Sequence, residues 1–297
     1  MAKKDLKGMG IALITPFKED ESVDYESLLK LVEYQIQKGT DYLVVLGTTA
    51  ETATLTEEEQ SEVVQAVVKQ VDRRIPVIQG VSSNCTYTVV EKLKKGNYQG
   101  VDAILSVVPY YNKPSQEGIY QHFKAIAEAT TIPIILYNVP GRTGTNMSAE
   151  TTLRIAHEFE HVIAVKEASG NFAQIDTILK NKPNHFQVIS GDDSLTFPMI
   201  TLGAVGVISV IGNALPGEFS RMVNLALTGD YISARSIHSN LLELYELLFV
   251  DGSPAGVKSL LHLMGFIENK LRLPLVPARI PTYEKIREAW QKLNVKN

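Results

Sequence analysis

Lys166 is the residue of this chain whose type and position most directly indicate chemistry. It stands at the carboxyl end of the apolar run 162–165, which is typical of a buried parallel strand. Removing an ammonium group from water is costly, so burial favours the neutral amine, which is a nucleophile. Taken alone, Lys166 also fits a lysine that extends from a strand end into water. The residues at the other strand ends favour the nucleophile.

Those other strand ends carry groups that complement an amine. Thr48 and Thr49 lie in a Gly-Thr-Thr turn whose hydroxyl and amide groups suit a small carboxylate. Tyr137 can transfer protons, and Arg142, in a Pro-Gly turn, can hold a second carboxylate with two hydrogen bonds. An amine, two carboxylate-binding groups and a proton relay are together what Schiff-base chemistry on a 2-oxo acid requires.

Each of these side chains also has a structural explanation. Tyr137 could be a large residue that closes a barrel, and the threonines could form an ordinary helix cap. Arg142 could belong to a surface ion pair, and Tyr110 and Tyr111 could pack within a loop. All these groups are much less easily placed around one lysine by chance than any one of them alone, so the joint pattern favours a catalytic site.

Composition and charge restrict the class of protein. A chain of 297 residues, 44% hydrophobic and 21% charged, suits one large α/β domain or two smaller ones. Its net charge of -4 offers no basic footprint for nucleic acid, and no apolar stretch reaches the roughly 18 residues that span a bilayer. No secretion signal is apparent, and the single cysteine, Cys85, excludes an intrachain disulfide. We therefore expect a cytoplasmic protein without nucleic-acid or membrane partners.

The elements that position these residues follow an alternating β-α pattern. Short apolar runs recur at roughly 25 to 30 residues, with amphipathic stretches between them, which predicts a parallel sheet with helical crossovers. The expected strands are Gly10–Pro16, Tyr42–Leu46, Pro76–Val81, Ala103–Val108, Ile134–Val139, Val162–Lys166, Phe186–Ser190 and Gly206–Val210.

About eight such units favour a (β/α)8 TIM barrel over an open sheet. The open-sheet alternative lacks its glycine fingerprint, because Gly8-Met9-Gly10 is expected to precede a strand and a third glycine is missing. We expect the barrel to span residues 1–230 and a C-terminal helical extension, packed on the barrel, to span 231–297. The helical stretches of that extension are expected at about 231–250, 254–270 and 282–294.

One motif points to a metal site that the context does not favour. His157-Glu158-Phe159-Glu160-His161 matches the H-E-x-x-H pattern of metalloproteases, which needs both histidines on one continuous helix. Here His161 directly precedes an expected strand, at the end of the barrel opposite Lys166. We therefore expect no metal site.

The residues at the strand ends resemble the dihydrodipicolinate synthase family, within a wider pyruvate-lyase group that includes N-acetylneuraminate lyase. The resemblance runs from Gly10 to the last helices, and it includes one departure, Ala50, where the family usually has glycine. The motifs that carry it are GTTAETATL, PYYNKPSQEG, LYNVPGRTG, VKEASG and SGDD.

This resemblance implies a reaction and a set of roles. The family condenses pyruvate with L-aspartate-4-semialdehyde to give 4-hydroxy-tetrahydrodipicolinate, an early step of diaminopimelate and lysine synthesis. Lys166 would form an imine with pyruvate, with no other cofactor. Tyr137 would be the central acid-base group, relayed by Thr49 and by Tyr111 from a neighbouring subunit.

The resemblance also assigns the substrate contacts. Thr48 and Thr49 would hold the carboxylate of pyruvate, and Arg142 would hold that of the aldehyde. Gly191 and Ile208 would place backbone carbonyls near the nucleophile. The alternative is another pyruvate aldolase, such as N-acetylneuraminate lyase or a keto-deoxy sugar-acid aldolase. Sugar-acid lyases tend to have an apolar residue at the position of Arg142, so the arginine favours the synthase.

Regulation and assembly are also implied by the resemblance. Asn84 and Tyr110 match the site at which lysine inhibits some members, at a subunit interface. Two family histidines are Glu57 and Gln60 here, and a family glutamate is Thr88, so we predict weak or absent inhibition by lysine. The use of Tyr111 across an interface requires at least a dimer. The family is commonly a homotetramer, a dimer of dimers, and the sequence does not separate these states.

Overall fold

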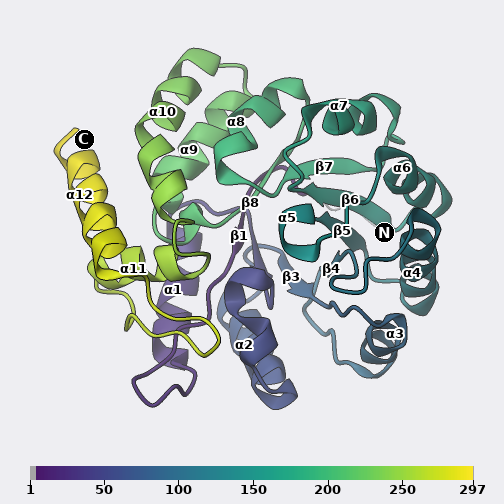
Figure 1. The fold of residues 1–297 in the computed structure, drawn as a ribbon, viewed down its shortest axis with the longest axis horizontal. Coiled ribbons are helices and arrows are strands. Elements are labelled where there is room, and N and C mark those ends of the chain that lie inside the picture. Colours follow the sequence, from purple (N-terminus) through teal and green to yellow (C-terminus); the bar gives the residue numbers. More distant parts are fainter. Residues whose placement is uncertain (1–4, 297) are drawn as a thin grey trace.

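The chain folds around a closed barrel of parallel strands, as the computed structural model of residues 5–296 describes (Figure 1). Within that range, eight strands pair in chain order and β1 closes the ring by pairing with β8. The TIM barrel predicted from the alternating pattern is therefore confirmed. The strands are β1 Gly8–Ala12, β2 Tyr42–Val45, β3 Val77–Gly80, β4 Ala103–Val107, β5 Ile134–Asn138, β6 Val162–Glu167, β7 Gln187–Ser190 and β8 Gly206–Ser209.

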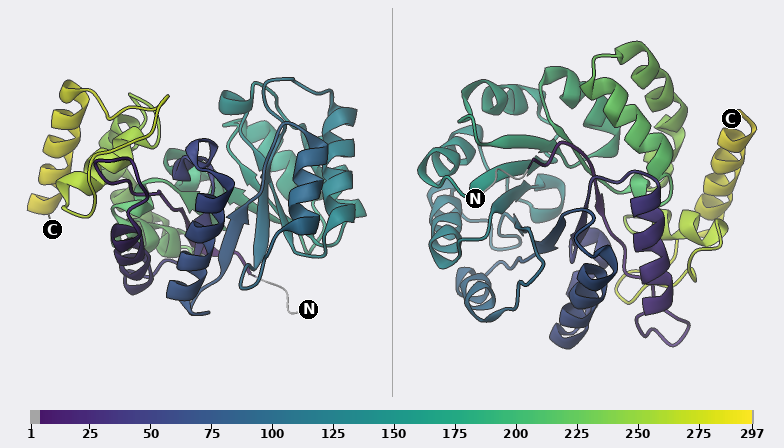
Figure 2. Two further views of the ribbon diagram at one scale, coloured as in Figure 1. Left: turned by 90° about the horizontal axis from the view of Figure 1, so that it is seen from below. Right: turned by 180° about the vertical axis from the view of Figure 1, so that it is seen from behind.

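Helices connect successive strands and form a ring outside the barrel (Figures 1 and 2). None of those in residues 5–296 is both long and apolar enough to cross a membrane. The α-helices are α1 Tyr25–Gln37, α2 Glu57–Val71, α3 Thr86–Lys95, α4 Gln116–Ala129, α5 Pro140–Thr143, α6 Ala149–Glu158, α7 Phe172–Asn181, α8 Asp193–Leu202, α9 Pro216–Leu227, α10 Tyr231–Leu247, α11 Ala255–Leu263 and α12 Ile280–Lys296. Short 3₁₀ helices are η1 Thr48–Ala50, η2 Thr52–Thr54 and η3 Ile211–Asn213.

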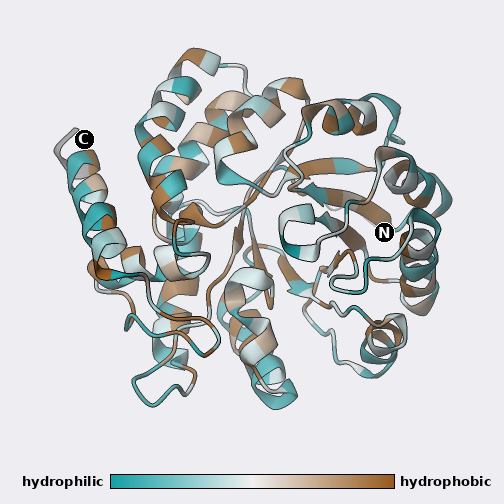
Figure 3. Cartoon of the chain, viewed as in Figure 1, coloured by the Kyte–Doolittle hydropathy of each residue, from teal (hydrophilic) through white to brown (hydrophobic). Residues whose placement is uncertain are grey.

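Side chains on alternate strand positions form two kinds of core. Those that point outward pack against the helices, and the apolar colouring of the strands in Figure 3 reflects burial on both faces. Those that point inward fill the barrel as one cluster, which includes Val44, Ile78, Leu105, Ile135, Tyr137, Ala164, Ile189 and Ile208. Lys166 lies two positions after Ala164 and therefore points into the barrel.

The first strand differs from the prediction. We expected Gly10–Pro16, but β1 spans Gly8–Ala12, so the glycines expected to precede the strand lie within it. Packing explains the difference. A Cβ atom on Gly10 would stand 1.9 Å from the Tyr42 ring, so glycine leaves room for that ring inside the barrel. Glycine at this position therefore permits close packing between strands.

The C-terminal helices α10, α11 and α12 lie on one flank of the barrel (Figures 1 and 2). Residues of α10 and α11 share one apolar cluster with the strands and with α1. The helix expected over 254–270 was too long, because α11 ends at Leu263. Gly265 adopts a left-handed conformation with φ of 77°, which ends the helix. The division of the chain at residue 230 stays a prediction.

Candidate active site

Strands β5 and β6 place Tyr137 and Lys166 side by side inside the barrel. The two residues are register partners across the parallel ladder, so their side chains point to the same face. The Lys166 amine lies 4.4 Å from the centroid of the Tyr137 ring. Both side chains are close to fully buried, with exposed fractions of 5% and 7%. The sequence predicted that these two residues meet at the carboxyl mouth of the barrel, and the structure brings them together there.

Burial makes the Lys166 amine easier to deprotonate. Loss of solvation lowers the pKa of Lys166 to about 8 from its ordinary value of 10.5. The carboxylate of Asp193 acts in the opposite direction, and the charge of Arg142 lowers the pKa further. An amine with this pKa is uncharged in about one molecule in ten at pH 7, compared with about one in a thousand or fewer for an ordinary lysine. The site therefore supplies a usable nucleophile near neutral pH.

The hydroxyl of Tyr137 is held in its protonated form. Burial raises the pKa of Tyr137 to about 12, although Arg142 and a hydrogen bond with the Thr48 side chain both act to lower it. A phenol of this kind can donate a proton and take it back. The hydroxyl that contacts Tyr137 belongs to Thr48, whereas the resemblance assigned the relay to Thr49. Thr49 is buried beside it in η1.

Asp193 is a residue that the sequence analysis quoted but gave no role. Its carboxylate is buried at the start of α8 and accepts hydrogen bonds from the backbone N–H groups of Val210 and Ile211, the shortest at 2.7 Å. Burial raises the pKa of Asp193 to about 6, so it is ionised at neutral pH. It is then a fixed negative charge that acts on Lys166. The SGDD sequence placed it at a strand end, but nothing in the sequence distinguished it from Asp192, which caps α8.

Gly191 and Ile208, predicted to lie near the nucleophile, belong to the ends of β7 and β8. A Cβ atom on Gly191 would stand 2.7 Å from the Cβ of Ala168 and 3.1 Å from Cγ and Cε of Lys166. Glycine at this position therefore makes room for the lysine side chain. Ile208 is buried within the barrel cluster.

A cavity of about 1080 Å³ opens above these strand ends and continues between α2 and α3. Thr48, Tyr137 and Arg142 line it, and Arg142 itself is exposed at the end of α5. This volume can hold a substrate considerably larger than pyruvate. The Arg142 guanidinium group is a positive charge on the cavity wall that remains open to solvent.

Tyr110 and Tyr111 lie in the loop after β4. Tyr110 lines the cavity, whereas the side chain of Tyr111 is 87% exposed. The backbone of Tyr111 is left-handed, with φ of 73°, which is uncommon for a residue with a large side chain. Its N–H donates to the carbonyl of Thr143 at 3.4 Å, and the neighbouring Asn112 amide donates to the Asn84 carbonyl at 3.0 Å. These contacts hold the loop in a conformation that points Tyr111 away from its own chain.

The remaining residues considered for lysine binding surround the far part of the cavity. Glu57, Gln60 and Thr88 all line it. Glu57 pairs with Lys92 at 3.4 Å, and the Gln60 amide donates to the carbonyls of Thr52 and Leu55. The first two side chains are therefore already engaged within the chain.

The histidines of the H-E-x-x-H match are held by different elements. His157 belongs to α6, which ends at Glu158, so His161 lies beyond the helix. A ring nitrogen of His157 contacts the Asn181 carbonyl at 3.1 Å, and one of His161 contacts the Ala127 carbonyl at 3.0 Å. Within residues 5–296, no group of three or more His, Cys, Asp or Glu side chains is arranged to hold a metal ion.

Fold and site together define a TIM-barrel enzyme with a buried lysine amine and a buried tyrosine side by side at the carboxyl mouth. The family model described as the dihydrodipicolinate synthetase family matches residues 5–293. A 4-hydroxy-tetrahydrodipicolinate synthase from Parabacteroides distasonis is 73% identical over 296 residues, covering the full length of both chains. The chain belongs to the dihydrodipicolinate synthetase family, as the sequence motifs predicted.

Solved structures agree with this assignment. Dihydrodipicolinate synthase from Aquifex aeolicus matches with a TM-score of 0.94 at 44% identity, covering 97% of this chain and 98% of that chain. The chloride-inhibited synthase from Acinetobacter baumannii, solved in complex with pyruvate, matches with a TM-score of 0.94 at 39% identity. That match covers 98% of this chain and 99% of that chain.

Proposed function

We propose that this enzyme condenses pyruvate with L-aspartate-4-semialdehyde to give 4-hydroxy-tetrahydrodipicolinate, through an imine on Lys166. The observation that carries the proposal is the buried Lys166 amine, with its pKa lowered to about 8, lying over the ring of Tyr137. The neutral amine attacks the C2 carbonyl of pyruvate, and loss of water gives the imine. The imine withdraws electrons from C2, so a methyl proton leaves and the resulting enamine carbon attacks the aldehyde, which becomes a hydroxyl group on protonation. The amine of the semialdehyde then attacks C2 and displaces the Lys166 amine, which closes the ring of the product and frees the enzyme.

Three hydroxyl groups supply the proton transfers in this proposal. Tyr137 protonates the departing water and later takes up protons from the substrate. Its hydrogen bond with Thr48 makes Thr48 the first relay group that we assign, with Thr49 beside it in the same turn. Tyr111 completes the relay from a neighbouring subunit, which accounts for its 87% exposure and left-handed backbone.

Two carboxylates need separate partners. The hydroxyl and N–H groups of Thr48 and Thr49 bind the carboxylate of pyruvate. Arg142 at the cavity rim binds the carboxylate of the semialdehyde. We propose that Gly191 and Ile208 supply carbonyl groups beside the nucleophile. The second substrate of a sugar-acid lyase presents hydroxyl groups instead of a carboxylate, so Arg142 disfavours that alternative.

Two further features rest on the same proposal. We propose a cytoplasmic homotetramer, a dimer of dimers, in which paired subunits exchange Tyr111. We also propose weak or absent inhibition by lysine, because Thr88 offers no carboxylate to a ligand ammonium and Glu57 already pairs with Lys92. Half-inhibition by lysine below about 1 mM, which corresponds to about 4 kcal/mol of binding, would contradict this.

The deciding experiment combines labelling with a choice of acceptor. Borohydride with pyruvate should label the peptide that contains Lys166, and a label elsewhere would refute the assigned nucleophile. The value of kcat/KM should strongly favour aspartate-4-semialdehyde over N-acetylmannosamine. In Arg142→Ala, that preference should fall by roughly 10- to 100-fold, the contribution of a charge-assisted pair, while labelling by pyruvate persists. A better rate with the sugar would assign the enzyme to the lyase branch.

A further inference from the structure

The turn that carries Thr48 and Thr49 combines two hydrogen bonds of its own with backbone conformations that need further support. Within the turn, the N–H groups of Ala50 and Glu51 donate to the carbonyls of Gly47 and Thr48, at 3.1 Å and 3.2 Å. Leu46 before it and Glu51 at its end both have left-handed backbones, with φ of 55°. Such conformations in residues other than glycine persist only where the surroundings hold them. Gly47, which precedes η1, provides no side-chain cap. Residues outside the turn therefore add restraint to its own hydrogen bonds.

One such restraint is the hydrogen bond from the Thr15 hydroxyl to the Ala50 carbonyl, at 2.8 Å, and another is a buried ion pair that reaches the turn from the C-terminal helices. The Glu51 carboxylate pairs with the amine of Lys258 in α11, and both side chains are fully buried. The backbone N–H of Arg272 donates to the same carboxylate at 3.1 Å. The Lys258 amine also donates to the Lys270 carbonyl at 3.0 Å and lies 4.2 Å from the centroid of the Phe17 ring. Each donor to Glu51 lies more than 200 residues further along the chain.

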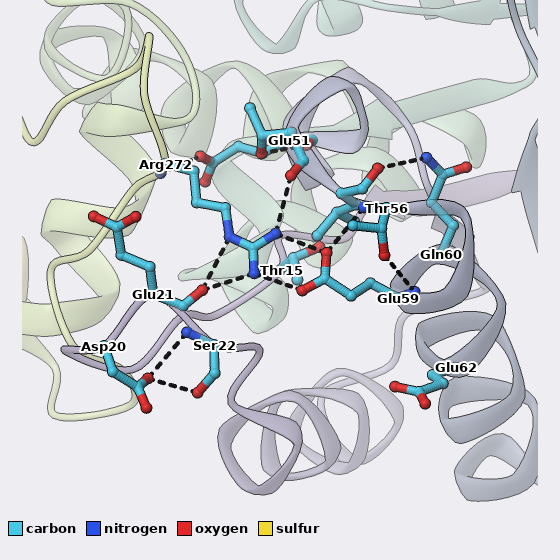
Figure 4. Close-up of polar contacts among 12 residues, drawn as sticks. Thr15, Asp20, Glu21, Ser22, Glu51, Thr56, Glu59, Gln60, Glu62 and Arg272 are labelled. Atoms are coloured by element: carbon cyan, nitrogen blue, oxygen red, sulfur yellow. Dashed lines mark hydrogen bonds and ion pairs between the residues drawn. The ribbon is translucent and has the colours of Figure 1, made fainter.

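Arg272 extends the same connection along the turn (Figure 4). Its guanidinium group donates to the Thr54 carbonyl at 2.9 Å and to both oxygens of Glu59, the shorter at 2.6 Å. It also donates to the carbonyl of Glu21, so one side chain joins the loop after β1, the turn and the start of α2. These contacts surround the segment that begins with Thr48 and Thr49.

We propose that Lys258 and Glu51 are positioning residues, which orient Thr48 and Thr49 toward the carboxylate of pyruvate. The inference rests on the proposed function of those threonines. It assigns the C-terminal extension a role in substrate binding, because Lys258 in α11 and Arg272 after it bind the residue that ends the turn, Glu51. A merely structural role for the pair would instead hold the helices on the barrel without affecting affinity for pyruvate.

The two roles differ in the constant that changes. The pyruvate concentration that half-saturates borohydride trapping measures pyruvate binding without the second substrate. In Glu51→Gln and Lys258→Met, we expect this concentration to rise roughly tenfold, the effect of weakening one charge-assisted hydrogen bond. The KM for the semialdehyde, which depends on Arg142, should change less than about twofold. Arg279→Met breaks a surface ion pair with Asp251 in the same extension and serves as the matched control, with both constants unchanged.

Folding must be separated from binding in this test. A single variant leaves one buried charge without its partner, so the double variant Lys258→Met/Glu51→Gln is measured alongside it. The double variant removes both charges and should still require more pyruvate than the wild type. An unchanged half-saturating concentration in the folded variants would overturn the inference, as would an equal rise for both substrates. Failure of the wild type to form an imine with pyruvate would instead refute the proposed function.

Discussion

The chain buries two lysine amines in similar surroundings but gives them different partners. Lys166 lies 4.4 Å from the centroid of the Tyr137 ring, and Lys258 lies 4.2 Å from that of the Phe17 ring. Burial lowers the pKa of both amines. Lys258, however, pairs directly with the carboxylate of Glu51 and donates to a backbone carbonyl. A lowered lysine pKa therefore does not by itself identify a nucleophile.

The partners of each amine explain the difference. The carboxylate that acts on Lys166 belongs to Asp193, which already accepts hydrogen bonds from Val210 and Ile211. The aromatic ring beside Lys166 carries a hydroxyl that can transfer protons, whereas Phe17 beside Lys258 has none. The amine of Lys166 lies beside the Tyr137 phenol at the barrel mouth, whereas the amine of Lys258, on α11, is held in an ion pair with Glu51.

The largest expected effect separates the two amines by reactivity. Lys166→Met removes the proposed nucleophile, so turnover should fall by at least about 10³-fold and pyruvate-dependent labelling by borohydride should disappear. Lys258→Met should still take the label at saturating pyruvate. Mass spectrometry of the labelled peptides measures both outcomes. A label that moves to Lys258, or that survives in Lys166→Met, would contradict the comparison.

The second prediction compares the two rings. Tyr137→Phe keeps the ring beside Lys166 and removes only its hydroxyl, so turnover should fall by about 10²–10⁴-fold through loss of the acid-base group. Phe17→Leu alters the ring beside Lys258 and should change stability, with little change in the rate of imine formation. Adding borohydride at successive times after pyruvate measures that rate in both variants. Equal rates of imine formation in Tyr137→Phe and the wild type would place the proton transfers elsewhere.

The strand-end residues explain how much of this comparison the sequence could predict. Lys166 followed a run of Val, Ile and Ala, and Tyr137 ended the preceding strand, so the barrel pattern alone brought them together. Lys258 follows Gly256 and Val257 in a helix, where an amphipathic pattern gives no sign that the amine is buried. Its partner Glu51 is 207 positions away, and pairing over that distance depends on how the C-terminal helices pack.

The loops account for the remaining differences. Thr48, which contacts Tyr137, lies in a turn that follows a left-handed backbone at Leu46, and sequence periodicity does not reveal such a conformation. The early end of α11 depends on Gly265, whose left-handed backbone the helical pattern of the sequence does not reveal. The sequence thus predicts the regular elements well, and the orientation of side chains between them poorly.

The third prediction is that the two lysines affect stability with opposite sign. The pKa of Lys166 falls from 10.5 to about 8 in the folded chain, so a charged Lys166 costs on the order of 3 kcal/mol at pH 7. Lys166→Met should raise the free energy of unfolding by up to that amount. Lys258→Met should lower it by roughly 3 to 5 kcal/mol, because Glu51 is left buried without its partner.

The pH dependence of stability checks the sign. Between about pH 8 and 10.5 the unfolded chain holds a proton on Lys166 that the folded chain has released, so the penalty decreases as the pH rises. Below pH 8 the penalty is constant. Lys166→Met should lack this contribution, which urea unfolding at several pH values would measure. A lower stability of Lys166→Met at pH 7 would contradict the prediction.

The smallest expected effect concerns Asp193, whose charge opposes the deprotonation of Lys166. Asp193→Asn keeps an oxygen for the N–H groups of Val210 and Ile211 but removes the charge, so the pKa of Lys166 should fall below about 8. More of the amine is then neutral at pH 7, and imine formation should be up to about fivefold faster there, with little change above pH 9. Trapping rates from pH 6.5 to 9 measure this shift.

Asp192→Asn is the matched control for that experiment. Asp192 caps α8 through Ser194 and acts on Tyr137, so its loss should leave the pH at half-maximal imine formation unchanged. If Asp193→Asn left the profile in place or moved it to higher pH, the Asp193 charge would not set the pKa of Lys166. The amine would then resemble Lys258 in one respect, with its pKa governed by burial and by groups in direct contact. If only Asp193→Asn shifts the profile to lower pH, the Asp193 carboxylate, which backbone N–H groups hold in place, raises the pKa of Lys166 without touching its amine.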